Sequence, residues 1–143
     1  MKMQQQSSKA MHITLWIAQS LLAVLFFMTG VIKLAMPIEK IAEMLPWVAN
    51  APAALVRFIG ISELLGAVGL VLPAALRIIP YLTPLAAVGV AIVMVLATAF
   101  HLFRGEVAHI LVPIVVFFIA VFIAWGRTKQ APIASKAYAL TGA

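Results

Sequence analysis

The stretch ITLWIAQSLLAVLFFMTGVIKLAM, from Ile13 to Met36, decides the fold. It holds a single charged side chain, Lys33, and as a helix it is long enough to cross the ~30 Å hydrocarbon core of a bilayer. Its apolar part is longer than that of a typical secretory signal, and no A-x-A-like cleavage site follows it. We therefore expect a retained membrane-spanning helix that ends at Pro37.

The remainder of the chain also has the composition of a membrane protein. Of its 143 residues, 65% are apolar and only 10% are charged, and the mean hydropathy is +1.15. Soluble domains are nearer half apolar and a quarter charged, so lipid must be the solvent of this chain. Its length suits one domain. The formal charge of +6 comes from cations beside apolar runs, which indicates membrane orientation rather than nucleic-acid binding.

Three more apolar segments predict an all-α, four-helix membrane bundle. They cover about residues 53–72, 81–103 and 107–125, in addition to residues 13–36. Helices are required because the lipid core offers the backbone no hydrogen-bonding partner.

The segments outside these four spans are shorter or more polar. Residues 38–47 have apolar side chains at helical spacing and predict a short helix in the membrane interface, anchored by Trp47. We expect residues 1–12 to be a disordered tail and residues 127–143 a second tail, so that the bundle occupies residues 13–126.

Lysine and arginine predict the orientation in the membrane. Four spans place both ends of the chain on the same side. That side would carry Lys2, Lys9, Arg77, Arg127, Lys129 and Lys136. The other side would carry only Lys40 and Arg104, each with acidic neighbours. The positive-inside rule then predicts that both termini are cytoplasmic, and we expect the plasma membrane of a bacterium, its inner membrane.

Polar side chains within the spans are the candidate functional residues, because such groups are costly in lipid. Glu63 lies about half-way along the second span, on a face that carries small residues. Lys33, Arg57 and His101 are placed nearer the outer ends of their helices. We predict that these four residues form an outer-leaflet polar pocket. Gln19, Thr29 and Thr98 are the predicted polar support.

Three interpretations of these polar residues stay open at this point. Lys33 or Arg57 could form a purely structural ion pair with Glu63. The excess of positive charge could instead bind an anionic head group or a quinone carbonyl. A proton relay is the third interpretation, although a single carboxylate is a poor conduit. His101, Glu106 and His109 do not have the spacing of a zinc motif, so we predict no metal.

The sequence contains no cysteine. Thiolate nucleophiles, disulfides, Cys-based zinc sites and Cys-ligated iron–sulfur clusters are therefore excluded. Any redox chemistry would need a bound cofactor or a partner. With no nucleophile elbow, phosphate loop or dinucleotide fingerprint either, we expect that the chain is not an enzyme on its own.

The order and spacing of several short segments resemble the DoxX-like family of four-helix membrane proteins. The segments are Trp16 with Gln19, FMTGVIKL (residues 27–34), GISELLGA (60–67), LVLP (70–73), PLAA (84–87), His101 and Gly105-Glu106. The resemblance extends from Trp16 to Arg127, and Lys33, Glu63 and His101 fall on polar positions of the family pattern. It implies the fold more than any one activity.

The family name comes from a subunit of a thiosulfate:quinone oxidoreductase, and distant relatives look like assembly chaperones. The resemblance therefore implies a quinone- or redox-associated membrane subunit. The alternatives are a non-enzymatic assembly factor or accessory subunit with a membrane-protein partner, and a small transporter that works as a homo-oligomer.

Overall fold

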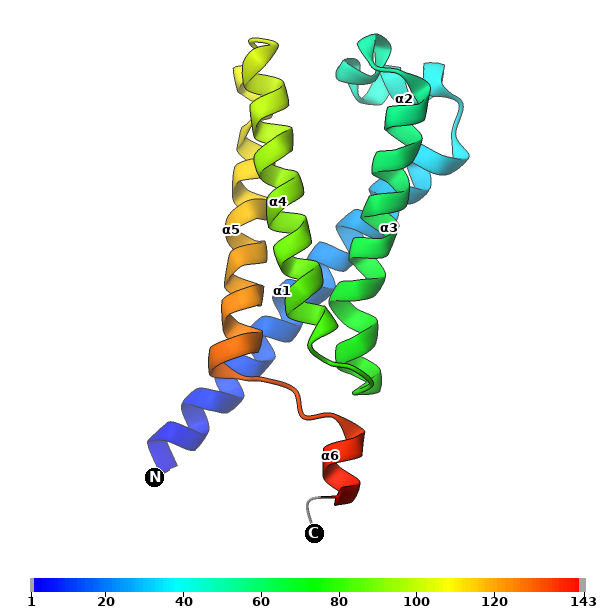
Figure 1. Cartoon of the computed structure of the whole chain (residues 1–143). Helices are drawn as coiled ribbons and strands as arrows, with labels where there is room; N and C mark the ends of the chain where they lie inside the picture. The colour runs from blue at the N-terminus through cyan, green and yellow to red at the C-terminus, as the bar shows by residue number, and fades with distance from the viewer. Residues whose placement is uncertain (1, 142–143) are drawn as a thin grey trace.

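The computed structural model describes residues 2–141, which form helices and connecting loops and contain no strand (Figure 1). The long helices are α1 (Lys2–Ala35), α3 (Ala53–Leu76), α4 (Leu82–Phe103) and α5 (Leu111–Trp125). The short elements are α2 (Ile38–Met44), η1 (Pro46–Asn50), η2 (Val107–His109), η3 (Gly126–Gln130) and α6 (Lys136–Thr141). Four segments are long and apolar enough to cross a membrane: Lys9–Ala35, Ala53–Leu76, Leu82–Phe103 and Val107–Gln130. The predicted all-α architecture with four apolar spans is confirmed.

Local sequence explains where the helices begin and end. Pro37 lies two residues beyond the end of α1 and immediately precedes α2, and Pro52 immediately precedes α3, where the missing N–H of proline is harmless. Arg77 ends α3 in the left-handed conformation, with φ of 57°. Gly105, with φ of 71°, turns the chain between α4 and η2, a conformation that glycine adopts without steric cost.

The long helices form two pairs. α1 packs against α3, α4 packs against α5, and contact between α3 and α4 joins the pairs. Both termini lie at one end of the bundle, and α2 lies at the opposite end (Figure 1). The core between the pairs includes Leu22, Phe26, Leu70, Val90 and Ile123, all nearly or fully buried.

The outer surface of the bundle is apolar. Leu21 and Leu65 are each 68% exposed and Phe118 is 65% exposed, on α1, α3 and α5 respectively. A soluble monomer rarely exposes such large contiguous apolar surfaces, so these side chains are suited to lipid.

The structure differs from the sequence-based boundaries in three places. Residues 2–12 continue α1, where the sequence suggested a disordered tail; Met1 lies outside the described residues. Extending an existing helix adds a hydrogen bond per residue, and this segment has no proline or glycine to stop it. Pro73 lies inside α3 instead of ending it. The fourth span begins with the separate turn η2 and continues beyond Trp125 as η3, a π-helix.

The second predicted tail is also more closely attached to the bundle than its polarity suggested. Arg127 is buried. The backbone N–H of Lys136 donates to the carbonyl of Arg77 (3.0 Å), and Arg77 Nε donates to the carbonyl of Ala134 (2.9 Å). Arg127, Ala134 and Lys136 thus contact the end of the bundle, and the bundle boundary at residue 126 stays a prediction; residues 142–143 lie outside the described region.

Candidate functional site

Two glycines allow α1 and α3 to approach closely beside the predicted polar residues. A Cβ atom at Gly30 would lie 2.9 Å from the carbonyl oxygen of Gly60, and one at Gly60 would lie 2.9 Å from the Cβ atom of Lys33. Real Cβ atoms do not tolerate these distances. The missing side chains therefore let the two backbones meet and place Lys33 opposite Glu63, one turn further along α3.

Lys33 and Glu63 form a buried ion pair. The Nζ atom of Lys33 donates to both carboxylate oxygens of Glu63, at 2.8 and 2.9 Å. The two side chains are 6% and 13% exposed. Each charge therefore has the partner that a group withdrawn from water requires. One of the sequence-based interpretations was an ion pair between Lys33 and Glu63, and the structure contains this contact.

Arg57 joins this pair through the backbone rather than through Glu63. Its Nη1 atom donates to the carbonyl oxygen of Lys33, in the last turn of α1. The carbonyls of a last turn lack partners within the helix and carry partial negative charge, which a cation stabilises. Three of the four predicted site residues, Lys33, Arg57 and Glu63, thus lie together.

His101 belongs to a separate cluster at the end of α4. Its Nδ1 atom lies 2.8 Å from Glu106 Oε2, and Arg104 Nε lies 2.9 Å from Glu106 Oε1. The ring of His109 stacks on that of His101, with centroids 5.6 Å apart. Hydrogen bonds from His101 and then Arg104 lower the pKa of Glu106, which lies in the loop outside the spans.

The three predicted support residues behave differently from one another. The hydroxyl of Thr29 donates to the carbonyl of Leu25 (3.0 Å), and that of Thr98 donates to Met94 (2.8 Å). Both therefore bond to their own helix, as hydroxyls in helices commonly do. Gln19 is fully buried and links helices instead, because its Nε2 atom donates to the carbonyl of Leu70 (2.7 Å).

A second buried polar cluster surrounds Gln19, and the sequence did not indicate it. The Nε atom of Arg127 donates to Gln19 Oε1, and its Nη1 atom lies 3.0 Å from His12 Nδ1. Its guanidinium lies 5.3 Å from the ring centroid of Trp16. A glutamine on an otherwise apolar helical face was the available signal, since a buried amide needs a partner.

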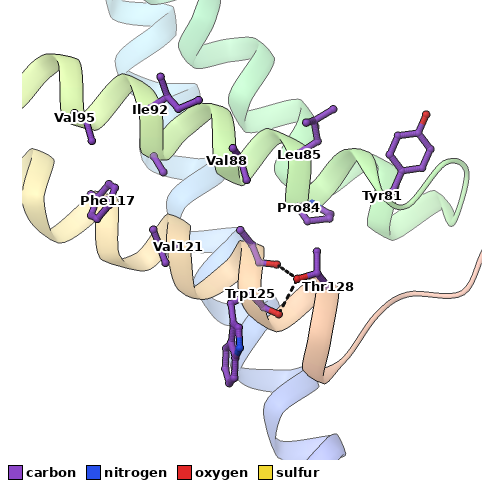
Figure 2. A pocket seen from close by; sticks show the side chains of 12 residues that line it. Tyr81, Pro84, Leu85, Val88, Ile92, Val95, Phe117, Val121, Trp125 and Thr128 are labelled. Carbon is purple, nitrogen blue, oxygen red and sulfur yellow. Dashed lines mark hydrogen bonds between the residues drawn. The ribbon is translucent and has the colours of Figure 1, made fainter.

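An open apolar groove runs between α4 and α5, with a volume of about 750 Å³. Figure 2 shows Val88 and Ile92 of α4 and Phe117 and Val121 of α5 along it. The hydroxyl of Thr128 is turned to its own helix, where it donates to the carbonyls of Ala124 (2.7 Å) and Trp125 (3.1 Å) (Figure 2).

A smaller pocket of about 460 Å³ lies near the N-terminal end of the first span. Its walls are Lys9, His12, Ile13, Gln130, Ala131 and Pro132. None of the four predicted site residues lines this pocket or the groove. The outer-leaflet ligand pocket stays a prediction. Within residues 2–141, no group of three His, Asp or Glu side chains is arranged to hold a metal ion.

Four apolar spans with charged groups paired between helices define a multi-pass integral membrane protein. The sequence model of the DoxX-like family matches residues 17–123, and the chain belongs to that family. No curated protein and no solved structure matches it.

Proposed function

We propose that this DoxX-like protein is a non-enzymatic accessory subunit that holds a transmembrane helix of another membrane protein along the α4–α5 groove. One observation carries the proposal. The groove is open and apolar over two neighbouring helices, whereas the charged groups between α1 and α3 are bonded to one another.

The lining of the groove suits a helix. Ala91 on α4 and Ala124 on α5 are small, and small residues let helices approach closely in lipid, where packing contributes to association. The hydroxyl of Thr128 already has two acceptors in its own helix. The groove therefore has few polar groups that need a hydrogen-bond partner, and it fits an apolar partner surface.

The ionisable groups of α1 and α3 have a structural part in this proposal. The Lys33–Glu63 pair and the Arg57 contact hold the ends of the two helices together. That scaffold supports α4, which packs on α3. A quinone-linked role would need a hydrogen-bond donor aimed at the quinone carbonyl, and two of the three N–H donors of Lys33 are already bonded to Glu63.

We further propose that the end bearing both termini is cytoplasmic, in the inner membrane of a bacterium. Four cations support this orientation: Arg77 ends α3 and its backbone carbonyl accepts from the N–H of Lys136 at the start of α6, and Arg127 and Lys129 lie in η3 at the end of the fourth span. α2 would then lie at the outer surface, where its exposed Glu39 and Lys40 can face water.

Site-specific crosslinking tests the proposed partner contact. The chain has no cysteine, so one introduced cysteine carries a photoactivatable label without background. Val88→Cys places the label in the groove, and Leu65→Cys places it on the exposed surface of α3 as a matched control. In membranes of the native host, Val88→Cys should give one protein adduct of defined mass, and Leu65→Cys should not.

A groove-filling change makes this experiment specific. Val121→Trp adds a large side chain to the groove wall and should abolish the Val88→Cys adduct. Equal adducts from both positions, lipid adducts only, or an adduct that survives Val121→Trp would contradict the proposal. An adduct of twice the chain mass would show that the partner is a second copy of this chain and not another protein.

A further inference from the structure

The cluster around Arg127 holds a buried cation that has no carboxylate partner among residues 2–141. Arg127 is 4% exposed. The chain has four acidic residues, Glu39, Glu43, Glu63 and Glu106. Glu63 is bonded to Lys33, and Glu106 to His101 and Arg104. Glu39 and Glu43 belong to α2, at the opposite end of the bundle (Figure 1). A buried charge without an opposite charge is costly.

The same cluster has more hydrogen-bond donors than acceptors. Arg127 Nε and Nη1 donate to Gln19 Oε1 and to the carbonyl of Ala131 (3.2 Å). Its Nη2 atom is buried and has no partner among the described residues. A guanidinium cannot accept a hydrogen bond, so the N–H groups of Nη2 need an acceptor that the surrounding described residues do not provide.

His12 shows the same shortage. Its Nδ1 atom lies 3.0 Å from Arg127 Nη1, and its Nε2 atom lies 3.1 Å from the indole nitrogen of Trp16. Arginine and tryptophan can only donate, and a neutral imidazole accepts at one nitrogen while the other carries hydrogen. In one of the two contacts, two hydrogen-bond donors therefore face each other with no acceptor between them.

The 460 Å³ pocket adjoins this cluster. His12 and Ala131, which both contact Arg127 Nη1, form part of its wall, and the exposed Lys9 adds a second cation. Lys9 begins the first span and Gln130 ends the last one. The pocket therefore lies at the depth of the lipid head groups, where basic pockets between helices bind anionic lipids.

We propose that the pocket formed by Lys9, His12 and Gln130 beside Arg127 binds a phosphate-class oxyanion. The phosphate of an anionic phospholipid head group and free phosphate share this chemistry. Its oxygens can accept from the Lys9 ammonium in the wall, and its negative charge offsets that of the Arg127 guanidinium, which is buried behind His12 and Ala131. The site is distinct from the α4–α5 groove and does not depend on the accessory function.

Ligand-dependent thermal unfolding of the full chain in a nonionic detergent tests this site. Short-chain phosphatidylglycerol should raise the unfolding midpoint saturably, whereas phosphatidylcholine of the same chain length should raise it less, because its choline cation neutralises its phosphate. Inorganic phosphate, titrated at constant ionic strength, separates the two sources. A shift with phosphatidylglycerol alone identifies a lipid head group, and a shift with phosphate alone identifies the free ion.

Two lysine variants decide whether the pocket is responsible. Lys9→Gln removes a wall residue and should weaken the apparent affinity about tenfold, the loss of one hydrogen bond to a charged group. Lys129→Gln removes the same charge from the same end without touching the pocket and should leave the affinity unchanged. Arg127→Gln, where it folds, should abolish the shift.

The proposal is overturned by equal weakening in Lys9→Gln and Lys129→Gln, which would indicate general charge attraction. It is also overturned if neither phosphatidylglycerol nor phosphate shifts the midpoint of the wild type, or if phosphatidylcholine shifts it equally.

Discussion

A Cβ atom at Gly60 would lie 2.9 Å from the Cβ atom of Lys33, closer than real side chains approach. The absence of a side chain at this position brings α3 against α1 at the level of the ion pair. The amino group of Lys33 can then reach both oxygens of Glu63, at 2.8 and 2.9 Å. Helix proximity and charge pairing therefore depend on each other here.

The first prediction concerns Gly60→Ala. In an exposed helix this change gains up to about 1 kcal/mol of helix propensity. Here the new methyl group meets the Cβ atom of Lys33 and the carbonyl oxygen of Gly30 in α1. Such overpacking typically costs about 1–3 kcal/mol. We expect a lower thermal unfolding midpoint in detergent. Gly89→Ala is the matched control, because nothing lies within 4 Å of its added Cβ atom. Equal behaviour of the two variants would show that the close approach has no energetic role.

The second prediction concerns the ion pair between α1 and α3. Glu63→Leu leaves the buried ammonium of Lys33 without a partner and should cost roughly 3–5 kcal/mol. Adding Lys33→Met removes the unpaired charge and should restore most of that loss. A double-mutant cycle on the free energy of unfolding measures the coupling. Additive effects of the two changes would mean that the pair is not coupled.

The third prediction is a pH dependence at the end of α4. Hydrogen bonds from His101 and Arg104 lower the pKa of Glu106 in the folded state. Its contribution to stability is therefore present above the ordinary glutamate pKa of about 4.3 and is lost as the pH falls through the lower folded value. The unfolding midpoint should fall over this acid range in the wild type more than in Glu106→Gln. Identical pH profiles would contradict the assigned contacts.

The fourth prediction concerns orientation. Lys40→Cys and Lys136→Cys each place one thiol at an exposed position, near opposite ends of the bundle. A membrane-impermeant maleimide should label Lys40→Cys in intact spheroplasts and Lys136→Cys only after permeabilisation. The reverse pattern would place both termini outside.

Much of the fold could be predicted because hydropathy and proline act locally. The long apolar segments predicted the four spans, and Pro37 predicted the end of the first one. α3 continues past residue 72, where the predicted span stops, since a proline such as Pro73 is tolerated within a membrane helix where packing supports the backbone. The helical start of α1 was missed because polar composition alone says little about extension from an existing helix.

The candidate site was predicted in part. The small residues on its helical face predicted that Glu63 points into the bundle, and it does meet Lys33. His101 was grouped with them because it lies near the same end of its helix, yet its partners are Glu106 and His109. Depth along a helix does not specify which neighbour a face meets. The contact of Arg127 with Gln19 could not be predicted either, because it joins residues far apart in sequence.

Native mass spectrometry after gentle extraction from native membranes tests the accessory role most directly. We predict a complex of this chain with a second polypeptide. Val121→Trp should dissociate it, and the control Leu65→Trp on the opposite pair of helices should preserve it. Detection of the chain alone, or of the chain with only a quinone that Glu63→Gln releases, would contradict the accessory role. The quinone result would indicate that the polar residues of α1 and α3 carry the function.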